Sequence, residues 1–344
     1  GRYGGCRGVL GYLARDIGYR LGGDLVAHQS RAMSRILITG AAGAVGQSLL
    51  SVLAGLGHEV IATDIRAPSG LSAGMRFVPM DVTGDDPARV IVAERPEVVV
   101  HLASIVSPPK SSTRAFEYAV DVTGSRNVLN ACVANGVRRI VVTSSGAAYG
   151  YHADNPVPLR EGDALRGNKA FAYAHHKRLV EEMLAQARTA HPALEQVVLR
   201  VGTVLGAGLE NQITALFHRK RLLAIRGADS PFVFIWTQDL ARILLRAATV
   251  GPAGIYNVAG DGALGIDQIA MKLGKPVLRL PAAGLRAALA VAKPLGLSRY
   301  GPEQVRFLQY RPVLDNQALK RDFGYQPDLT SAEVFDLWQK AAGL

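Results

Sequence analysis

One short stretch constrains the fold of this 344-residue chain more than any other. The apolar run Ile36-Leu-Ile38 breaks at Thr39, three glycines follow with the spacing G-x-x-G-x-x-G at Gly40, Gly43 and Gly46, and an alanine-rich segment continues at helical spacing. The first glycine permits a tight turn, the second leaves room for phosphate oxygens, and the third lets helix and strand pack closely. The N-terminus of the helix attracts an anion. The stretch therefore predicts a strand–turn–helix unit that holds the pyrophosphate of a dinucleotide; the alternative is a plain glycine turn.

Apolar runs and helical patterns alternate regularly after this unit. Strands are expected at 35–39, 59–63, 76–79, 97–102, 138–144 and 195–201, and helices at 44–56, 85–94, 114–135 and 170–190. This alternation predicts the α/β class, with a Rossmann-like, doubly wound parallel sheet. We expect residues 33–205 to form the NAD-binding domain, which includes the helix at 170–190.

The pattern becomes less regular after about residue 205. Helices are expected near 209–220, 237–249, 265–273, 281–293, 301–309, 315–323 and 330–342, and short strands near 222–225, 231–236, 254–258 and 276–279. We expect 206–344 to form mainly a smaller C-terminal α/β lobe that binds the substrate, with some segments returning to the sheet.

Composition narrows the class of protein. The chain has two cysteines, Cys6 and Cys132, so it carries neither a disulfide framework nor a thiolate metal site, and a cytoplasmic location is expected. The net charge is +11, but the basic residues are scattered, which argues against nucleic-acid binding. No stretch is apolar enough to span a bilayer. Residues 1–32 are interpreted as an N-terminal extension, mobile or a start-site artefact, because Met33 directly precedes the first strand.

A carboxylate ends the second predicted strand. Asp64 lies 24 residues after Gly40, the position of an acid that binds the adenosine ribose. A carboxylate there repels a 2′-phosphate and favours NAD over NADP, although Arg66 softens that preference. The alternative for Asp64 is a strand-end turn residue. Asp81-Val82 follows the third strand and either reaches the adenine or forms a turn.

Two further segments carry groups suited to proton transfer. Tyr173 and Lys177 are four residues apart, so on a helix they share one face. A free tyrosine has a pKa of about 10, and a neighbouring ammonium and the positive nicotinamide ring would both lower it. Ser144 and Ser145 end the strand at 138–144, and ligands bind at the carboxyl ends of parallel strands. Each serine alone is equally consistent with a turn cap.

Taken together, these motifs resemble the extended short-chain dehydrogenase/reductase family, of the NAD-dependent epimerase/dehydratase type. The likeness rests on TGAAGAVG at 39–46, Asp64, Asp81-Val82, HLAS at 101–104, TSS at 143–145 with Tyr149-Gly150, Tyr173/Lys177 with Glu181, Leu199-Arg200, Val204-Leu-Gly206, Asp315 and Phe323-Gly-Tyr-Gln-Pro327. The resemblance implies that Ser145, Tyr173 and Lys177 are catalytic. The cofactor contacts it implies are Gly40, Ala42, Gly43, Ala44, Val45, Gly46, Asp64, Ile65, Arg66, Asp81, Val82, Leu102, Ala103, Ser104, Thr143, Tyr173 and Lys177. For the substrate it suggests Ser107, Ser145, Gly146, Thr203 and Trp236. It also implies a homodimer formed through helices 114–135 and 170–190.

The chain departs from the family pattern at informative places. Dehydratases carry an Asp-Glu pair after the catalytic hydroxyl, where this chain has Gly146-Ala147, so dehydration is not expected. The sugar epimerases carry an arginine that holds a phosphate where this chain has Phe232; Arg226 is a nearby substitute. With Phe234 and Trp236, Phe232 suggests a less charged substrate, or else the core of the lobe. His175 and His176 are interpreted as a helix face and not as metal ligands, and His101 as a strand-end residue near the cofactor.

The sequence thus predicts an NAD-dependent oxidoreductase that transfers a hydride at a hydroxyl or carbonyl carbon of a small or sugar-like substrate. One alternative is a UDP-sugar 4-epimerase that keeps its NAD tightly bound, because it needs the same three residues. A second alternative is a non-catalytic protein that senses NAD(P).

Overall fold

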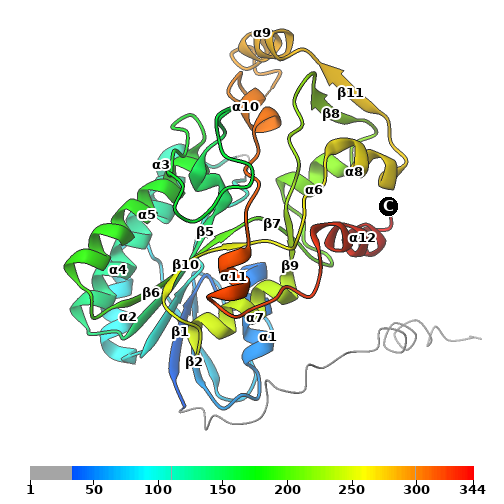
Figure 1. Ribbon diagram of the computed structural model, residues 1–344. Helices are drawn as coiled ribbons and strands as arrows, with labels where there is room; N and C mark the ends of the chain where they lie inside the picture. Colours follow the sequence, from blue (N-terminus) through cyan, green and yellow to red (C-terminus); the bar gives the residue numbers. More distant parts are fainter. Residues whose placement is uncertain (1–32, 110, 299) are drawn as a thin grey trace, which may run out of the picture. The chain divides into compact units, whose positions relative to one another are not determined.

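A parallel sheet of seven strands organises the computed structural model, which describes residues 33–109, 111–298 and 300–344 (Figure 1). The strand order is β10-β6-β5-β4-β1-β2-β3. The expectation for residues 1–32 lies outside the described residues. The strands are β1 (Arg35–Thr39), β2 (Glu59–Asp64), β3 (Met75–Pro79), β4 (Val98–His101), β5 (Arg139–Ser145), β6 (Glu195–Val201) and β10 (Gly254–Val258). The order reverses between β1 and β4, and in such sheets ligands bind where the order reverses.

Helices cover both faces of this sheet (Figure 1). Ile36 and Ile38 of β1 point to the face of α1 (Ala44–Leu53) and α7 (Thr237–Ala248), while Leu37 points to the opposite face. That second face packs against α2 (Asp86–Glu94), α4 (Gly124–Ala134) and α5 (Ala172–Ala190). Burial on both faces explains why these strands are continuously apolar. The predicted fold class is confirmed.

The segment predicted as one helix over 114–135 is built differently. It consists of α3 (Arg114–Tyr118), a π-helical turn (Ala119–Thr123) and α4. A π turn shifts the helix register by one residue, so side chains after it face directions that ideal helical spacing does not give. Two further elements lie outside the predicted ranges, the 3₁₀ turn Gly146–Tyr149 and the short strand β7 (Thr203–Leu205).

The C-terminal segments form smaller layers. β7 pairs with β9 (Phe234–Trp236), and β8 (Leu222–Ile225) pairs with β11 (Val277–Leu280), both in parallel. The helices are α6 (Gln212–Phe217), α8 (Ile266–Leu273), α9 (Ala282–Ala292), α10 (Gln304–Gln309), α11 (Gln317–Arg321) and α12 (Ser331–Ala342). Two segments of this part, α7 and β10, belong to the large sheet and its helical cover. Within the described ranges, no helix has both the length and the apolar character needed to cross a bilayer.

Candidate active site

The glycine turn after β1 has the shape that a pyrophosphate requires. Gly40 has a φ of +68°, and a Cβ atom there would lie 2.7 Å from the backbone nitrogen of Ala103. A Cβ on Gly46 would lie 2.4 Å from the carbonyl oxygen of Gly40. At Gly43, by contrast, a Cβ would meet only that carbonyl, at 3.3 Å, and the residue is exposed. Two glycines thus permit close backbone packing, and the middle one leaves an open face at the N-terminus of α1.

The start of α1 is free of competing groups. Its N-cap is Gly43, which offers no side-chain acceptor, and its first turn holds no acidic residue. Ala44 is exposed and Val45 partly exposed. The N–H groups of this turn are therefore available to an anion. This arrangement fits the dinucleotide pyrophosphate predicted from the sequence.

Asp64 braces the same turn from the end of β2. One of its carboxylate oxygens accepts a hydrogen bond from the N–H of Ala42 at 3.1 Å, and the other accepts from the N–H of Arg66 at 3.4 Å. Each oxygen has a further lone pair with which to bind ribose hydroxyls. Ile65 and Arg66 are exposed beside it. Asp64 is consequently both a turn brace and a fitting ribose ligand, so the two interpretations of it are compatible.

Asp81 and Val82 form the predicted turn. Asp81 accepts hydrogen bonds from the N–H and the hydroxyl of Thr83 at 2.9 and 2.7 Å, and its own N–H donates to Asp86. Val82 is 6% exposed and packs in the core against Gly124. Of the two expectations for this pair, the structure shows the turn. An adenine would be reached only through the second carboxylate oxygen of Asp81 and the backbone.

The end of β4 lies directly against the glycine turn. The hydroxyl of Thr39 accepts hydrogen bonds from the N–H groups of Leu102 and Ala103 at 3.1 and 3.2 Å. It also lies 2.7 Å from Nδ1 of His101, which is buried at 3% exposure. These contacts hold Leu102 and Ala103 beside Gly40. His101 is indeed a strand-end residue, and its role is to join β1 to β4.

The three predicted catalytic residues meet at the carboxyl end of β5. Ser145 is the last residue of β5 and forms a hydrogen bond with the phenol of Tyr173. Tyr173 and Lys177 lie on α5, with the Lys177 nitrogen 5.4 Å from the centre of the tyrosine ring. That nitrogen donates to the carbonyl oxygen of Thr143 at 2.8 Å. The strand end and the helix face thus bring together a hydroxyl, a phenol and an ammonium.

Burial shifts the proton affinities of these groups. Burial raises the pKa of Tyr173 above its ordinary value, and the hydrogen bond from Ser145 only partly opposes this. Burial also lowers the pKa of Lys177, while Asp121 and Glu181 raise it. The prediction that the ammonium and the positive nicotinamide ring together lower the tyrosine pKa stays a prediction. The groups of this chain keep the phenol protonated near neutral pH.

A buried acid–imidazole pair lies beside the catalytic residues, and the sequence did not indicate it. Asp121, in the π turn, accepts from Ser104 at 2.9 Å and from the N–H of Ile105 at 2.8 Å, and its second oxygen lies 3.0 Å from Nδ1 of His176. His176 is 1% exposed and lies on the buried face of α5. The Asp121 carboxylate thus fixes the position of the Ser104 hydroxyl. Among the described residues there is no cluster suited to a metal ion.

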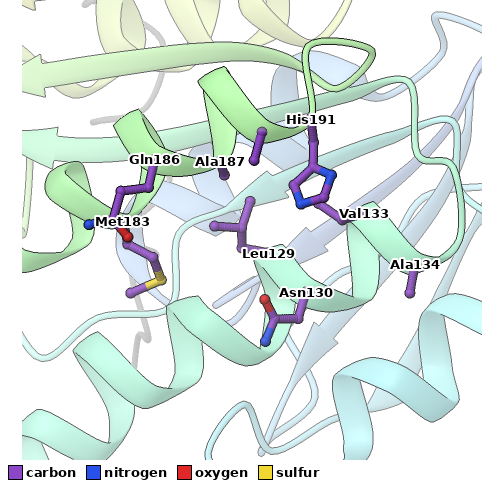
Figure 2. A pocket seen from close by; sticks show the side chains of 9 residues that line it. Leu129, Asn130, Val133, Ala134, Met183, Gln186, Ala187 and His191 are labelled. Carbon is purple, nitrogen blue, oxygen red and sulfur yellow. The ribbon is translucent and has the colours of Figure 1, made fainter.

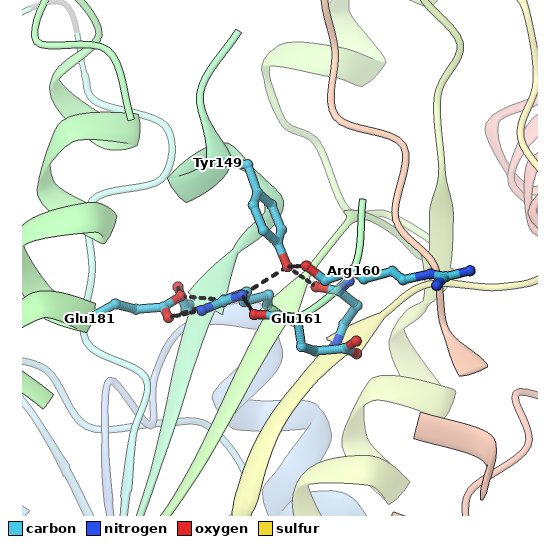
Figure 3. A network of polar contacts seen from close by, with 7 residues as sticks. Tyr149, Arg160, Glu161 and Glu181 are labelled. Atoms are coloured by element: carbon cyan, nitrogen blue, oxygen red, sulfur yellow. Dashed lines mark hydrogen bonds and ion pairs between the residues drawn. The ribbon is translucent and has the colours of Figure 1, made fainter. Parts of the chain in front are cut away.

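A second polar network fastens α5 to the sheet (Figure 3). Glu181, one turn after Lys177, accepts three hydrogen bonds from Nε and Nη2 of Arg200 and one from the hydroxyl of Ser144. Nη1 of Arg200 donates to the hydroxyl of Tyr149 and to the carbonyl oxygen of Glu161, both at 2.8 Å. The network fixes the end of β5 and the catalytic face of α5 relative to each other. It also explains why the Tyr-Gly, Leu-Arg and Glu motifs occur together in this chain.

The predicted substrate residues differ in how exposed they are in the structure. Ser107 is exposed on the loop after β4, and Thr203 is partly buried on β7. Gly146 follows Ser145 and is buried, and a Cβ there would meet the side chain of Leu314 at 3.2 Å. Trp236 is 9% exposed and packs in the core of the lobe, and its contact with a substrate stays a prediction.

The other two aromatic residues of this strand region are also core residues. Phe232 and Phe234 are 2% and 0% exposed, and they pack around Phe217. Of the two interpretations given for these aromatic residues, the structure shows the core of the lobe. Arg226, the suggested substitute for a phosphate-binding arginine, is exposed on the loop after β8.

Comparison with known proteins decides the family. A sequence model of the NAD dependent epimerase/dehydratase family matches residues 36–259. The chain belongs to this family. An uncharacterized protein of Mycobacterium tuberculosis (strain ATCC 25618 / H37Rv) is 28% identical over 316 residues, which cover 90% of this chain and 84% of that protein. A UDP-glucose 4-epimerase of Azospirillum brasilense is 33% identical over 227 residues, which cover 58% of this chain and 62% of that protein.

Solved structures share the fold. MoeE5 in complex with UDP-glucose and NAD has a TM-score of 0.69 at 21% identity, with 90% of this chain and 98% of that chain covered. The UDP-glucose 4-epimerase of Thermus thermophilus in complex with NAD has a TM-score of 0.67 at 23% identity, with 89% and 98% covered. At these identities the likeness concerns the fold.

Proposed function

We propose that this family member is an NAD-dependent oxidoreductase that acts at a hydroxyl or carbonyl carbon of a small or sugar-like substrate. The observation that carries the proposal is the meeting of Ser145, Tyr173 and Lys177 at the end of β5. This is the sheet edge at which the glycine turn of β1 also opens. The proposed roles are hydride transfer, supplied by bound NAD, and proton transfer, supplied by the protein.

Each side chain has a task that follows from its contacts. Ser145 binds the reacting oxygen and already hydrogen-bonds the phenol that shares this oxygen. Tyr173 passes a proton to that oxygen in reduction and takes the proton in oxidation. A positive charge bound beside the phenol favours the second direction by stabilising the phenolate. Lys177 is anchored on Thr143 and is placed to hold the nicotinamide ribose.

NAD is proposed as the cofactor in preference to NADP. Asp64 ends β2 with its carboxylate beside the glycine turn, where it would repel a 2′-phosphate. Arg66 is exposed two residues later and is the neighbouring group that would weaken the preference. The solved relatives described above contain NAD, which supports the same choice.

The experiment has two steps. Nucleotide released from the denatured protein is identified by mass spectrometry, or NAD and NADP are titrated into the protein, and we expect tighter binding of NAD. A panel of sugars, nucleotide sugars and hydroxysteroids is then tested for NAD reduction. The variant Tyr173→Phe should bind NAD normally and lose roughly 10²- to 10⁴-fold in turnover. Turnover equal to that of the unchanged protein would refute the catalytic assignment.

A second candidate function, UDP-sugar 4-epimerisation, is favoured by the relatives that carry that name. It uses the same three residues and returns the hydride to the opposite face of the sugar. Conversion of UDP-glucose to UDP-galactose without net NADH formation would identify it. A non-catalytic NAD(P) sensor is the remaining alternative, and it would be supported if Tyr173→Phe left the biological activity intact.

We further propose a homodimer formed through α4 and α5. A hollow of about 400 Å³ lies on the outer side of these two helices (Figure 2). Its lining combines apolar side chains such as Val133, Met183 and Ala187 with polar ones such as Asn130 and Gln186. It is distant from the catalytic residues, which lie at the opposite end of α5. A second copy of the same helices would bury these side chains.

A further inference from the structure

Helix α9 lies at the outer end of the C-terminal lobe, away from the seven-stranded sheet (Figure 1). Apart from Gly284 and Arg286, all its residues are alanine, leucine or valine, yet none of them is buried. Its inner side packs through Leu285 and Leu289 against buried side chains of β8 and α10. A surface helix of a globular protein normally has a polar outer side. Helix α9 is instead apolar all round, although the lobe covers only one side of it.

The outer side of α9 carries small apolar side chains. With about 3.6 residues per turn, Ala283, Ala287 and Val291 lie opposite Leu285 and Leu289. All three are exposed. The side of the helix that faces away from the lobe therefore presents methyl groups where charged or amide side chains would be expected.

The loop that follows α9 adds larger aliphatic side chains at the end of the helix. The N–H groups of Leu297 and Ser298 donate to the carbonyl oxygen of Ala292 at 2.9 and 3.2 Å, so the loop folds back onto the last turn. Val291, Leu295 and Leu297 are 61%, 65% and 79% exposed. Single exposed aliphatic residues are ordinary, but a group of them marks an interaction surface. We call this surface, formed by the outer side of α9 together with Leu295 and Leu297, the α9 patch.

The part of the chain around the α9 patch is strongly basic. Residues 271–311 contain eight lysines and arginines and one acidic residue, Glu303, and so carry most of the net charge of +11. Lys293 pairs with Glu303. Arg286 is exposed, and its guanidinium donates to the amide oxygen of Gln309 at 3.2 Å; no ion pair among the described residues includes it. An aliphatic surface with a positive rim is complementary to anionic headgroups above acyl chains.

The chemistry of the patch fits a lipid surface better than a protein partner. Its alanine, valine and leucine side chains offer no hydrogen-bonding group. Protein interfaces are instead enriched in aromatic and arginine anchors and form about one hydrogen bond per 100–200 Å². Tyr300, three residues after Leu297, is exposed as well. Tyrosine is enriched where a membrane meets water, because its ring is apolar and its hydroxyl is polar.

We propose that the α9 patch binds the surface of an anionic lipid bilayer. The outer side of α9 lies in the plane of the interface, Val291, Leu295 and Leu297 contact the start of the acyl chains, and Arg286 lies among the headgroups. With eleven residues, α9 is too short to cross the bilayer, so the protein lies on the membrane and does not span it. This binding is independent of the proposed catalytic activity.

The test measures sedimentation of the full chain with lipid vesicles. We expect binding to phosphatidylcholine vesicles that contain about 30% phosphatidylserine and not to phosphatidylcholine alone, because only the first attract a basic surface. Raising NaCl from about 0.05 M to about 0.5 M should weaken binding, since salt screens this attraction. Val291→Asp should weaken binding at least about tenfold, whereas Val291→Leu should preserve it. Arg286→Gln should weaken it about fivefold.

Val92→Asp is the matched control, because Val92 is similarly exposed on α2, which covers the large sheet. It adds the same charge as Val291→Asp and should leave vesicle binding unchanged. Melting temperature and mass by light scattering are measured for each variant, and Val291→Asp should alter neither, because the residue is exposed.

Four results would overturn the inference. The unchanged protein does not sediment with the anionic vesicles, or it sediments equally well with the neutral ones. Val291→Asp binds as tightly as the unchanged protein, or Val92→Asp weakens binding equally. Val291→Asp unfolds at a lower temperature by as much as its loss of binding requires. Val291→Asp lowers the mass in solution, which would show that a second copy of the chain covers the α9 patch.

Discussion

His101 allows a quantitative prediction about stability and pH. It is 3% exposed at the end of β4. Thr39 Oγ1 accepts two backbone N–H bonds, so its hydrogen is free to point at Nδ1 of His101, while Nε2 lies 2.9 Å from the hydroxyl of Ser125. This arrangement is complete for a neutral imidazole with its proton on Nε2. Burial, assisted by the charge of Lys177, lowers the pKa of His101 to about 3.

The sign and size of the effect follow from proton linkage. The unfolded chain binds a proton at this histidine below its ordinary pKa of about 6.5, whereas the folded chain does not until about pH 3. Acid therefore favours unfolding: the full stability is present above pH 6.5 and falls by about 1.4 kcal/mol per pH unit below it. Between pH 7 and pH 5, this one residue costs about 2 kcal/mol.

The assay is urea unfolding at pH 7 and pH 5 for the unchanged protein and His101→Asn. Asparagine keeps a polar group near Nδ1 but cannot titrate, so all other ionisable groups cancel in the comparison. The unchanged protein should lose about 2 kcal/mol more than the variant between the two pH values. The measured quantity is the change in the free energy of unfolding between the two pH values, and the overall stability of the variant does not enter the comparison. If the two proteins lose the same free energy within about 0.5 kcal/mol, the reasoning about a buried neutral imidazole is refuted.

Three further predictions concern other parts of the fold. Glu181→Gln leaves the buried guanidinium of Arg200 without its carboxylate, so the free energy of unfolding measured with urea should fall by about 3–5 kcal/mol. The control Glu182→Gln, in a more exposed ion pair one residue later, should lower it by less than about 1 kcal/mol, and equal losses for the two variants would contradict this. Burial raises the pKa of Cys132 to about 12, so in a Cys6→Ser background it should resist thiol reagents at pH 8 until the protein unfolds, and rapid labelling of the native protein would disprove this. Ala187→Arg on the outer face of α5 should halve the mass measured by light scattering; a monomeric unchanged protein would exclude the dimer.

The sheet and its first turn could be predicted because their causes are local. The strand at 35–39 begins and ends as predicted, since a run of apolar residues followed by Gly40 is sufficient to specify a buried strand and a turn. The strand at 195–201 also has the predicted bounds. Tyr173 and Lys177 share a helix face because four residues make about one turn. In each case the information lies within a dozen residues.

Features that depend on contacts between distant segments escaped sequence analysis. The sequence placed His176 on a helix face but did not indicate its partner, because Asp121 is 55 residues away and the π turn that holds this carboxylate has no reliable sequence signal. Likewise, nothing in the local pattern connects Arg311 with Ser230, 81 residues earlier. Their contact exists only after the lobe has folded.

The site thus has two parts of different physical origin. The cofactor end is built mainly from one continuous stretch, since a turn with Gly40, Gly43 and Gly46 specifies most of its own shape. The catalytic end is assembled from segments that meet through packing, since Lys177 of α5 reaches the carbonyl oxygen of Thr143 on β5 only in the folded chain. Motif patterns therefore identify the family from sequence alone. Pairs such as Asp121 and His176 depend on neighbours that only the folded chain brings together, so no motif pattern can reveal them.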